Sequence, residues 1–276
     1  MSDRLSALLA RFELRAKVGH HGALSADLQF SGLSGSGQLH LLRAGALLWL
    51  EPGLPPLQLD QPCAVLVPRA RTYRLQAVVA QEAELISAGL QFGLGDENPI
   101  LRGLPDRLVI PLSDAPALDG TLQLLFGEAH AQRCGHDAVV DRLIEVLLVQ
   151  LLRVAIERKQ LDSGLLSGLS DLRLAKAFAA LHAEPARSWT LETLAAAAGM
   201  SRARYAARFA ELVGLTPGEY LMHWRIGLAK SMLRQGASVK SVAQSVGYGS
   251  PSALARVFTQ QLGVPPRQWL LQQAAH

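Results

Sequence analysis

The sequence SRARYAARF at residues 201–209 recurs in the form SPSALARVF at residues 250–258, at an offset of 49 residues. Upstream of each copy stands a turn glycine, Gly199 or Gly247, at an offset of 48. Each copy reads as a capped apolar helix, a glycine turn and a second serine-capped helix. This order is typical of a helix-turn-helix. A chain with two such units is predicted to read DNA.

The composition is that of a globular chain with room for two domains. With 276 residues and 49% hydrophobic content, the chain can bury more than one core. Its apolar stretches are interrupted, as at 143–156 by Glu145 and Arg153, so none reaches the roughly 18 residues of a membrane span. The first residues lack the pattern of a secretory signal peptide. We therefore expect a cytoplasmic protein that does not associate with membranes.

The charge is divided unevenly along the chain. Residues 1–170 hold 15 Lys and Arg against 18 Asp and Glu, whereas residues 171–276 hold 12 against 5. A solvated basic face would by itself explain this excess. Together with the repeat, the excess favours a polyanion-binding module in the C-terminal half.

The N-terminal half has a different pattern. Between residues 19 and 126, short apolar runs alternate with Gly- and Pro-rich breaks, which is typical of an all-β sandwich or barrel. The runs are 26–30, 38–42, 46–50, 57–59, 64–67, 73–79 and 84–92. We predict an antiparallel β-barrel. From residue 137 to residue 159 the apolar residues follow helical spacing, which predicts one amphipathic helix of about six turns that packs on the barrel or on a second copy.

These patterns indicate an α+β chain of two domains. We expect a sensor and dimerisation domain at residues 1–160, a linker rich in Ser, Gly and Leu at 161–170, and an all-α domain at 171–276. In the all-α domain, helices are predicted at 171–182, 190–198, 201–213, 219–235, 238–245 and 250–262, with a final helix after Pro265-Pro266. The helix at 219–235 would separate the two units by about 26 Å.

The C-terminal half resembles the AraC/XylS family of bacterial transcription regulators. The residues that carry the resemblance are Trp189-Thr190-Leu191, Gly199-Met200-Ser201-Arg202, Arg208-Phe209, Thr216-Pro217, Trp224-Arg225, Val242-Ala243, Val246-Gly247-Tyr248, Phe258 and Gly263-Val264-Pro265-Pro266. The preceding half resembles the cupin-type sensor domain of one branch of that family, through His40, Gly45, Pro52-Gly53, Pro68-Arg69 and the stretch 137–152. The resemblance implies a DNA-binding regulator with a cupin-like sensor domain.

Helical geometry separates inward from outward residues in the second helix of each unit. The expected inward residues are Tyr205, Phe209 and Leu212 in the first unit, and Leu254 and Phe258 in the second. By resemblance, the base-reading positions are Ala203, Ala207, Ser252 and Arg256. Arg256 is suited to a bidentate contact with guanine, and the alanines to thymine methyl groups. The expected contacts to the DNA backbone are Ser201, Arg202, Arg204, Arg208, Ser250, Thr259 and Gln260, of which the serines are also helix caps.

Several of these residues have a purely structural alternative. Arg204 and Arg208 could be solvated helix arginines. Arg225 lies in the middle of the connecting helix, where an internal ion pair is expected instead of a DNA contact. Trp224 and Tyr248 are expected to be core aromatics and not base-stacking groups.

The sensor half lacks the histidine pattern of a metal-binding cupin, which needs His-x-His and a later Glu and His on facing strands. His40 has no histidine two residues away, and Tyr73 stands where the later histidine would be expected. His20 and His21 are adjacent and would point to opposite faces of a strand. We therefore expect no metal, no cofactor and no catalysis, and a small-effector pocket at His40 and Tyr73.

The two cysteines are too few for a disulfide framework. Cys63 is expected to be a small buried thiol at the start of a strand. Cys134 follows Arg133 and precedes the amphipathic helix, where positive charge and a helix N-terminus would lower the pKa of its thiol. Oxidation of Cys134, with Cys63 as the second candidate, would make the sensor a redox switch.

The sequence therefore predicts a DNA-binding transcription regulator controlled by a small ligand or an oxidant. By family resemblance it would be an activator that contacts RNA polymerase, and it would act as a homodimer on double-stranded DNA. The alternative is a metal-dependent cupin-fold enzyme tethered to a DNA-binding domain. The effector, the operator and the direction of regulation stay open.

Overall fold

The structure of this chain is a computed structural model that describes residues 14–24, 26–32, 36–78, 82–93, 98–131, 133–158 and 164–274. These residues form two compact units. The β unit comprises the described residues of 14–93 and 104–158, and the helical unit comprises residues 98–103 and 164–274. In this part of the chain, no helix combines the length and the apolar character needed to cross a membrane.

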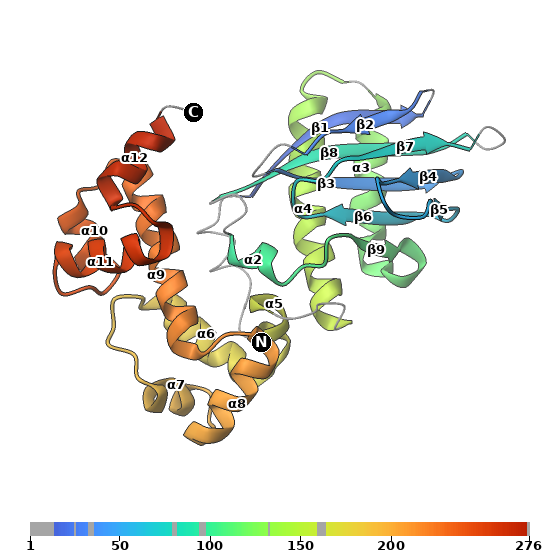
Figure 1. The fold of residues 1–276 in the computed structure, drawn as a ribbon. Helices are drawn as coiled ribbons and strands as arrows, with labels where there is room; N and C mark the ends of the chain where they lie inside the picture. The colour runs from blue at the N-terminus through green and yellow to red at the C-terminus, as the bar shows by residue number, and fades with distance from the viewer. Residues whose placement is uncertain are drawn as a thin grey trace. The chain divides into compact units, whose positions relative to one another are not determined.

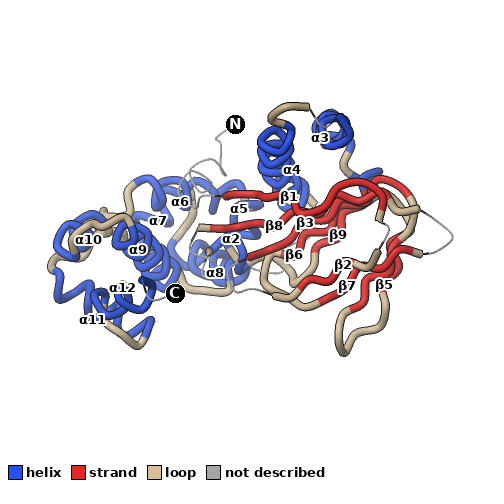
Figure 2. The backbone as a smooth tube through the Cα atoms, turned by 90° about the horizontal axis from the view of Figure 1, so that it is seen from above, coloured by secondary structure: helices blue, strands red, loops and turns tan. Residues whose placement is uncertain are grey.

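The β unit contains two antiparallel sheets (Figures 1 and 2). The larger sheet has the order β1 (Leu14–Ala23), β8 (Glu84–Phe92), β3 (Ser36–Ala44), β6 (Cys63–Val67) and β9 (Leu108–Pro111). The smaller sheet has the order β2 (Leu28–Phe30), β7 (Tyr73–Ala77), β4 (Leu47–Leu50) and β5 (Leu57–Leu59). The predicted antiparallel, cupin-like fold is confirmed. The described strands nevertheless form two sheets and not one closed barrel, since the edge strands β1 and β9 of the larger sheet are not paired with the edge strands β2 and β5 of the smaller one.

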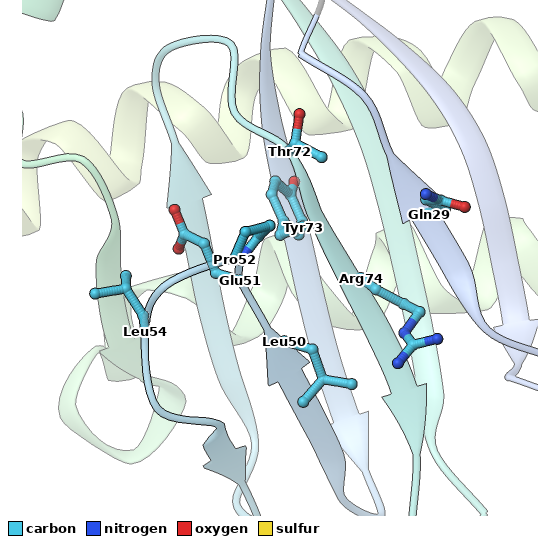
Figure 3. A pocket seen from close by; sticks show the side chains of 8 residues that line it. All are labelled: Gln29, Leu50, Glu51, Pro52, Leu54, Thr72, Tyr73 and Arg74. Carbon is cyan, nitrogen blue, oxygen red and sulfur yellow. The ribbon is translucent and has the colours of Figure 1, made fainter.

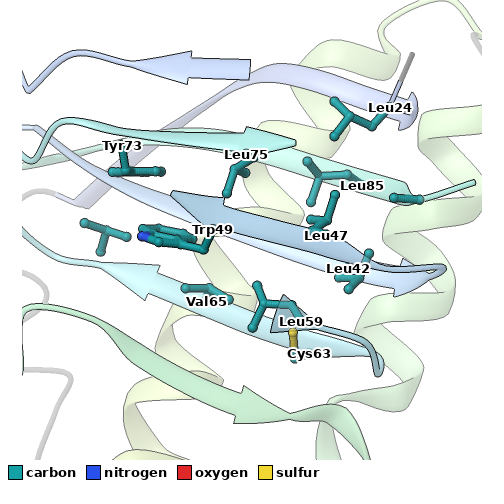
Figure 4. Close-up of a cluster of buried hydrophobic side chains, with 12 residues drawn as sticks. Leu24, Leu42, Leu47, Trp49, Leu59, Cys63, Val65, Tyr73, Leu75 and Leu85 are labelled. Carbon is teal, nitrogen blue, oxygen red and sulfur yellow. The ribbon is translucent and has the colours of Figure 1, made fainter. Parts of the chain in front are cut away.

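The core of the β unit lies between the two sheets (Figure 4). Leu42, Val65 and Leu85 come from the larger sheet, and Trp49 and Leu75 come from the smaller one. Alternate residues of each strand therefore point into one shared apolar layer, as expected for packed sheets.

The seven apolar runs of the sequence overlap β2 to β8. Strand β1 does not correspond to an apolar run, because it is an edge strand with exposed Arg15 and Lys17.

After β9, two short 3-10 helices, η2 (Leu112–Asp114) and η3 (Pro116–Leu118), lead to helix α3 (Asp119–Ala131). The buried residues of α3 are Leu122, Leu125, Phe126 and Ala129. This is helical spacing, so the interpretation of residues 19–126 as all-β overlooked a helix that the sequence indicates.

Helix α4 (His136–Glu157) is the predicted amphipathic helix. Its buried side chains, including Ile144, Leu147 and Leu151, face α3 and β1, so the helix packs on its own β unit (Figure 1). Asp141 accepts a hydrogen bond from the backbone N–H of Val18 at 2.9 Å. Side chains of α4 thus satisfy backbone groups on the free edge of β1.

The helical unit is built from nine helices among the residues that the structure describes. They are α2 (Pro99–Arg102), α5 (Leu165–Ser170), α6 (Leu172–Ala183), α7 (Leu191–Ala197), α8 (Arg202–Val213), α9 (Pro217–Arg234), α10 (Val239–Ser245), α11 (Pro251–Leu262) and α12 (Pro266–Ala274). From α6 onward they match the predicted helices.

Helix α5 lies inside the predicted linker at 161–170, and this part of the prediction needs correction. Residues 165–169 are buried in the helical unit. A Cβ atom at Gly168 would lie 2.7 Å from the ring of Phe178. The small residues that favoured a linker instead allow α5 to pack closely on its neighbours.

The two sequence repeats form two helix-turn-helix units, α7–α8 and α10–α11, on either side of α9 (Figure 1). The hydroxyls of Ser201 and Ser250 cap α8 and α11 by accepting hydrogen bonds from Arg204 N and Ala253 N. Both turn glycines have a positive φ, +63° at Gly199 and +85° at Gly247, a region that favours glycine. The repeat therefore specifies the same backbone twice, and the 18 residues of α9 span about 27 Å between the copies.

Candidate DNA interface and sensor site

The first unit exposes the residues that the sequence predicted to contact DNA, except Arg208, which is half-buried. On α8 the exposed residues include its cap Ser201 and Arg202, Ala203, Arg204 and Ala207, and the buried ones are Tyr205, Phe209 and Val213. Leu212, expected to point inward, is half-buried. The outward face thus presents two methyl groups flanked by arginines, and their contacts with DNA stay a prediction.

The three arginines of α8 have different surroundings. Arg208 donates to Asp171 from Nε at 3.0 Å and to Glu211 from Nη1 at 2.9 Å. Arg202 forms an exposed ion pair with Glu192 at 2.8 Å. The guanidinium of Arg204 makes no ion pair with any residue that the structure describes. Arg208 therefore fastens α8 to the start of α6, whereas the side chain of Arg204 is available to a phosphate.

Asp171 receives Arg208 and is also the N-cap of α6. Its carboxylate accepts hydrogen bonds from the backbone N–H groups of Arg173 and Leu174. Burial acts to raise the pKa of Asp171, but the hydrogen bond from Arg208 and those from the helix N-terminus lower it overall. This arrangement makes Arg208 a structural residue in addition to any role at the DNA.

The second unit presents a different outward face. Ser252, Arg256 and Gln260 are exposed on α11, Thr259 is half-buried, and Leu254 and Phe258 are buried. Arg256 has no hydrogen bond or ion pair with its guanidinium among the described residues. A guanidinium without an internal partner can approach a base edge without first breaking an ion pair.

The aromatic residues near the connecting helix lie in the core, as their structural alternative proposed. Trp224 is buried, and its ring centroid lies 3.9 Å from that of His182. Tyr248 is half-buried. The ion pair expected for Arg225 is not formed, because its guanidinium donates to the backbone carbonyls of Pro185 and Arg187, both at 2.9 Å. Arg225 is thus internal, but its acceptors are carbonyl oxygens and not a carboxylate.

In the β unit, His40 and Tyr73 meet across the two sheets. The Nε2 atom of His40 is hydrogen-bonded to the Tyr73 hydroxyl at 2.6 Å, and Nδ1 to Ser87 Oγ at 2.9 Å. The Tyr73 ring stacks between Trp49, at 4.0 Å between centroids, and Phe30, at 4.9 Å. Burial lowers the pKa of His40 to about 3, so its imidazole is neutral at neutral pH. His40 is 2% exposed and fills the space between the two sheets, whereas Tyr73 also lines a hollow that is open to the surface.

An open basin lies beside Tyr73, at the rim of the two sheets (Figure 3). It consists of two adjoining hollows of about 400 and 660 Å³ that share Glu51, Pro52 and Thr72. The first hollow is also lined by Gln29, Leu50, Leu54, Tyr73 and Arg74, and the second by Arg69, Ala70, Arg71 and Asp106. Sequence reasoning missed this basin, although three arginines within six residues, at 69, 71 and 74, were a signal.

Charged side chains organise the basin. The buried carboxylate of Glu51 accepts a hydrogen bond from Arg71 Nε at 2.6 Å, and Arg107 Nη1 lies 3.6 Å from it. Asp106 pairs with Arg69 at 2.7 Å and with Arg71. The hydrogen bond from Arg69 lowers the pKa of Asp106, with Arg71 acting in the same direction against burial. Three guanidinium groups thus meet two carboxylates, which leaves this cluster with net positive charge.

The two cysteines occupy different environments, and both are free thiols. Cys63 is buried in β6, where desolvation and the charge of Asp60 raise the pKa of its thiol to about 11. A thiol that stays protonated is a poor oxidant sensor, so the structure disfavours Cys63. Cys134 is exposed in the turn before α4, and its redox role stays a prediction. In the described ranges, no group of three or more His, Cys, Asp or Glu side chains could hold a metal ion.

Comparisons with known proteins follow the same division of the chain. Residues 3–157 match the family described as Cupin, and residues 194–272 match the family described as Helix-turn-helix domain. The crystal structure of ToxT from Vibrio cholerae O395 aligns with 95% of this chain and 98% of its own length, at 16% identity and a TM-score of 0.41.

Two relatives align with most of this chain, and the second of them shows its family. An HTH-type transcriptional regulator of Haemophilus influenzae, itself uncharacterised, is 29% identical over 97% of this chain and 98% of its own length. A protein of Streptomyces lividans named as an AraC-like transcription regulator is 39% identical over 207 residues, which are 73% of this chain and 68% of that protein. The chain therefore belongs to the AraC-like family of transcription regulators and has a cupin domain in its N-terminal half.

Proposed function

We propose that this regulator reads two adjacent DNA segments, with α11 supplying the base contacts and α8 mainly holding the backbone. The observation that carries the proposal is Arg256, which is exposed on α11 and has no internal partner among the described residues. A bidentate pair between arginine and guanine contributes about 1–3 kcal/mol of discrimination. On α8, by contrast, Ala203 and Ala207 offer only methyl groups, and Arg204 lies beside them for a phosphate.

DNA sites selected from a random library provide the test. Arg256→Ala should lower the preference for one guanine about 5- to 150-fold. The matched control is Arg204→Ala, an exposed arginine of the other unit, which should weaken all sequences equally and make the salt dependence shallower by about one phosphate contact. Unchanged base preference in Arg256→Ala would contradict the assignment, and a wild-type protein without any sequence preference would contradict the proposal as a whole.

We place effector control at the basin beside Tyr73 and not at His40. The basin is open, it borders the aromatic stack, and the adjoining cluster of Arg69, Arg71 and Arg107 carries net positive charge. These features suit a small molecule with an anionic group, because arginine binds carboxylate and phosphate in a bidentate manner. Oxidation at Cys134 is the second candidate signal. An unchanged response of a reporter promoter to oxidants in Cys134→Ser would contradict it.

Helix α2 supports a route from the sensor sequence to the DNA-reading helices. It lies between β8 and β9 in the chain, yet Ile100 and Leu101 are buried in the helical unit, where α2 packs on α5. Helix α5 contacts α8, and Gly164 N donates to Leu212 O at 2.9 Å. We propose that effector binding changes the position of α8 through α2 and α5.

We propose further that the protein acts in the cytoplasm as a homodimer that activates transcription through RNA polymerase. Exposed Val139 and Val146 on α4 provide an apolar surface for the second copy. The names of the relatives, which are all those of regulators, support a role without catalysis. Stoichiometric iron, zinc or manganese in the purified protein would instead favour a cupin-fold enzyme tethered to a DNA-binding domain.

A further inference from the structure

Arg225 links the segment before the first helix-turn-helix unit to the turn of the second unit. It lies in the middle of α9, the helix between them. Its Nε and Nη2 atoms donate to the carbonyl oxygens of Pro185 and Arg187, at 2.9 Å each, in the segment that leads into α7. The same guanidinium lies 5.7 Å from the ring centroid of Tyr248, in the turn before α11. One side chain therefore contacts the entrance to the first unit and the turn of the second.

Gly247 shows that these contacts form one packed junction. A Cβ atom at Gly247 would lie 2.7 Å from Arg225 Nη2 and 2.8 Å from the Cα and carbonyl oxygen of Ala186. The turn of the second unit thus rests directly on the segment before the first. Gly199 holds the equivalent turn of the first unit with a similar positive φ, but a Cβ there would meet nothing within 4 Å. Backbone conformation explains both glycines, whereas close approach explains Gly247 alone.

The chemistry of the junction requires arginine. Two donors in one plane, held at a fixed separation, reach two carbonyl oxygens while the central carbon of the group lies over the Tyr248 ring. A lysine ammonium is a compact point charge and cannot make these three contacts at once. Loss of the junction would leave the two helix-turn-helix units joined mainly by α9, and the angle between them could then change.

We propose that Arg225 is a positioning residue that fixes the separation and angle between α8 and α11, and thereby sets the spacing of the two DNA segments that one chain reads. The proposal rests on the proposed function, since it assumes that both units contact DNA. Arg225 itself does not read a base. Its effect is on the length of DNA between the two contacted segments.

The experiment compares selected sites of native spacing with sites that carry one inserted or one deleted base pair between the two segments. Wild-type protein should discriminate strongly against both changes. Arg225→Lys should lower affinity for the native spacing about tenfold, which corresponds to about 1.4 kcal/mol, and it should bind the three spacings within about twofold of one another. Its preference for the guanine assigned to Arg256 should be unchanged.

Gly247→Ala and Gly199→Ala form a matched pair, since both place a Cβ at a positive φ. Gly247→Ala should lose spacing discrimination as Arg225→Lys does, and Gly199→Ala should keep it. A readout without DNA uses spin labels at the exposed positions 210 and 260 in a Cys134→Ser background. The distance distribution should be narrow in the wild type and in Gly199→Ala, and broad in the other two variants, even where DNA binding is lost.

The possible outcomes separate this proposal from the proposed function. Retained spacing discrimination in both Arg225→Lys and Gly247→Ala, or an unchanged narrow distance distribution in both, would overturn the role of Arg225. An equal loss of spacing discrimination in Gly199→Ala would overturn the role of Arg225 as well. Backbone strain in the turn would then explain the loss in Gly247→Ala without any contact to Arg225. Failure of the wild type to prefer any sequence would overturn the proposed function, while the distance distributions would still test the junction.

Discussion

At the scale of single residues, the interior of the β unit contains a polar pair inside an aromatic stack. His40 is hydrogen-bonded through both ring nitrogens, and its ring meets Phe30 and Trp49 edge-on. Sequence reasoning singled out His40 because it lacks the second histidine of a metal-binding cupin, and Tyr73 because it stands where the later histidine would be expected. It could not show that Phe30 and Trp49 fill the space around them, because that depends on how two sheets face each other.

The depressed pKa of His40 predicts that acid destabilises the β unit. The native state keeps this imidazole neutral down to a pKa of about 3, whereas the unfolded chain takes up a proton below about 6.5. Stability is therefore fully present above pH 6.5 and falls by about 1.4 kcal/mol per pH unit as the pH drops below it towards 3. Urea unfolding of the β unit, measured through hydrogen exchange at the amides of its strands, should show this slope.

The control for this prediction is His40→Gln, which retains hydrogen-bonding groups but does not titrate. Titrating carboxylates affect both proteins equally, so the informative quantity is the difference between the two curves. The wild type should lose stability more steeply than His40→Gln between pH 6.5 and pH 4. Parallel curves over that range would show that His40 does not carry the effect.

At the scale of elements, local signals predict the helix-turn-helix units well and predict other segments poorly. Caps such as Ser201 and turn glycines such as Gly247 specify their helices within a few residues. Strand β1 is instead stabilised by pairing with β8, more than sixty residues away in the sequence. The buried position of helix α5 depends on a close contact between Gly168 and Phe178. A single sequence displays neither a distant pairing partner nor a close contact between helices, which is why a strand was missed and a buried helix was taken for a linker.

The contact between α4 and β1 leads to a prediction about this edge strand. Asp141 accepts from Val18 N at 2.9 Å and from Lys17 Nζ at 3.1 Å, and it is almost entirely buried. Asp141→Ala would leave a backbone donor without its acceptor and should lower the free energy of unfolding by about 1–3 kcal/mol. Hydrogen exchange at the amide of Val18 should accelerate as well.

Asp137 on the same helix is the matched control, since its side chain is 76% exposed. Asp137→Ala should change the free energy of unfolding by less than about 0.5 kcal/mol. Thermal or urea unfolding of both variants tests the difference. Equal destabilisation by the two substitutions would mean that helix charge, and not the bond to β1, determines the contribution of Asp141.

At the scale of the whole molecule, the two units are not simply consecutive in the chain. The chain leaves the β unit before α2, returns to it at Leu104, and leaves it again before α5. The single domain boundary near residue 160 that the sequence predicts therefore assigns α2 to the N-terminal domain, although α2 is buried in the helical unit. The sequence predicted one linker because the Ser-, Gly- and Leu-rich stretch 161–170 stands between the long amphipathic helix and the helices of the C-terminal half, whereas α2 has only four residues, too few for an apolar period.

This interleaving predicts that two neighbouring leucines stabilise different units. Leu101 is buried in the helical unit, and Leu104, three residues later, is buried in the β unit. Replacing either by alanine removes the same atoms and should cost about 2–5 kcal/mol, since both are core residues. The two substitutions should differ in which unit of the structure they destabilise. Hydrogen exchange measured by mass spectrometry should show reduced protection in α5 and α6 for Leu101→Ala, and in β6 and β9 for Leu104→Ala.

The comparison also tests the route proposed from sensor to α8. If α2 holds α5 against α8, Leu101→Ala should weaken DNA binding at temperatures where Leu104→Ala does not, although Leu101 lies in the sensor half of the sequence and far from the reading helices along the chain. Reduced protection of the β strands alone in Leu101→Ala would place α2 with the sheets and remove the physical basis for that route. Reduced protection of α5 and α8 together would mean that a four-residue helix from the sensor sequence is part of the DNA-binding core.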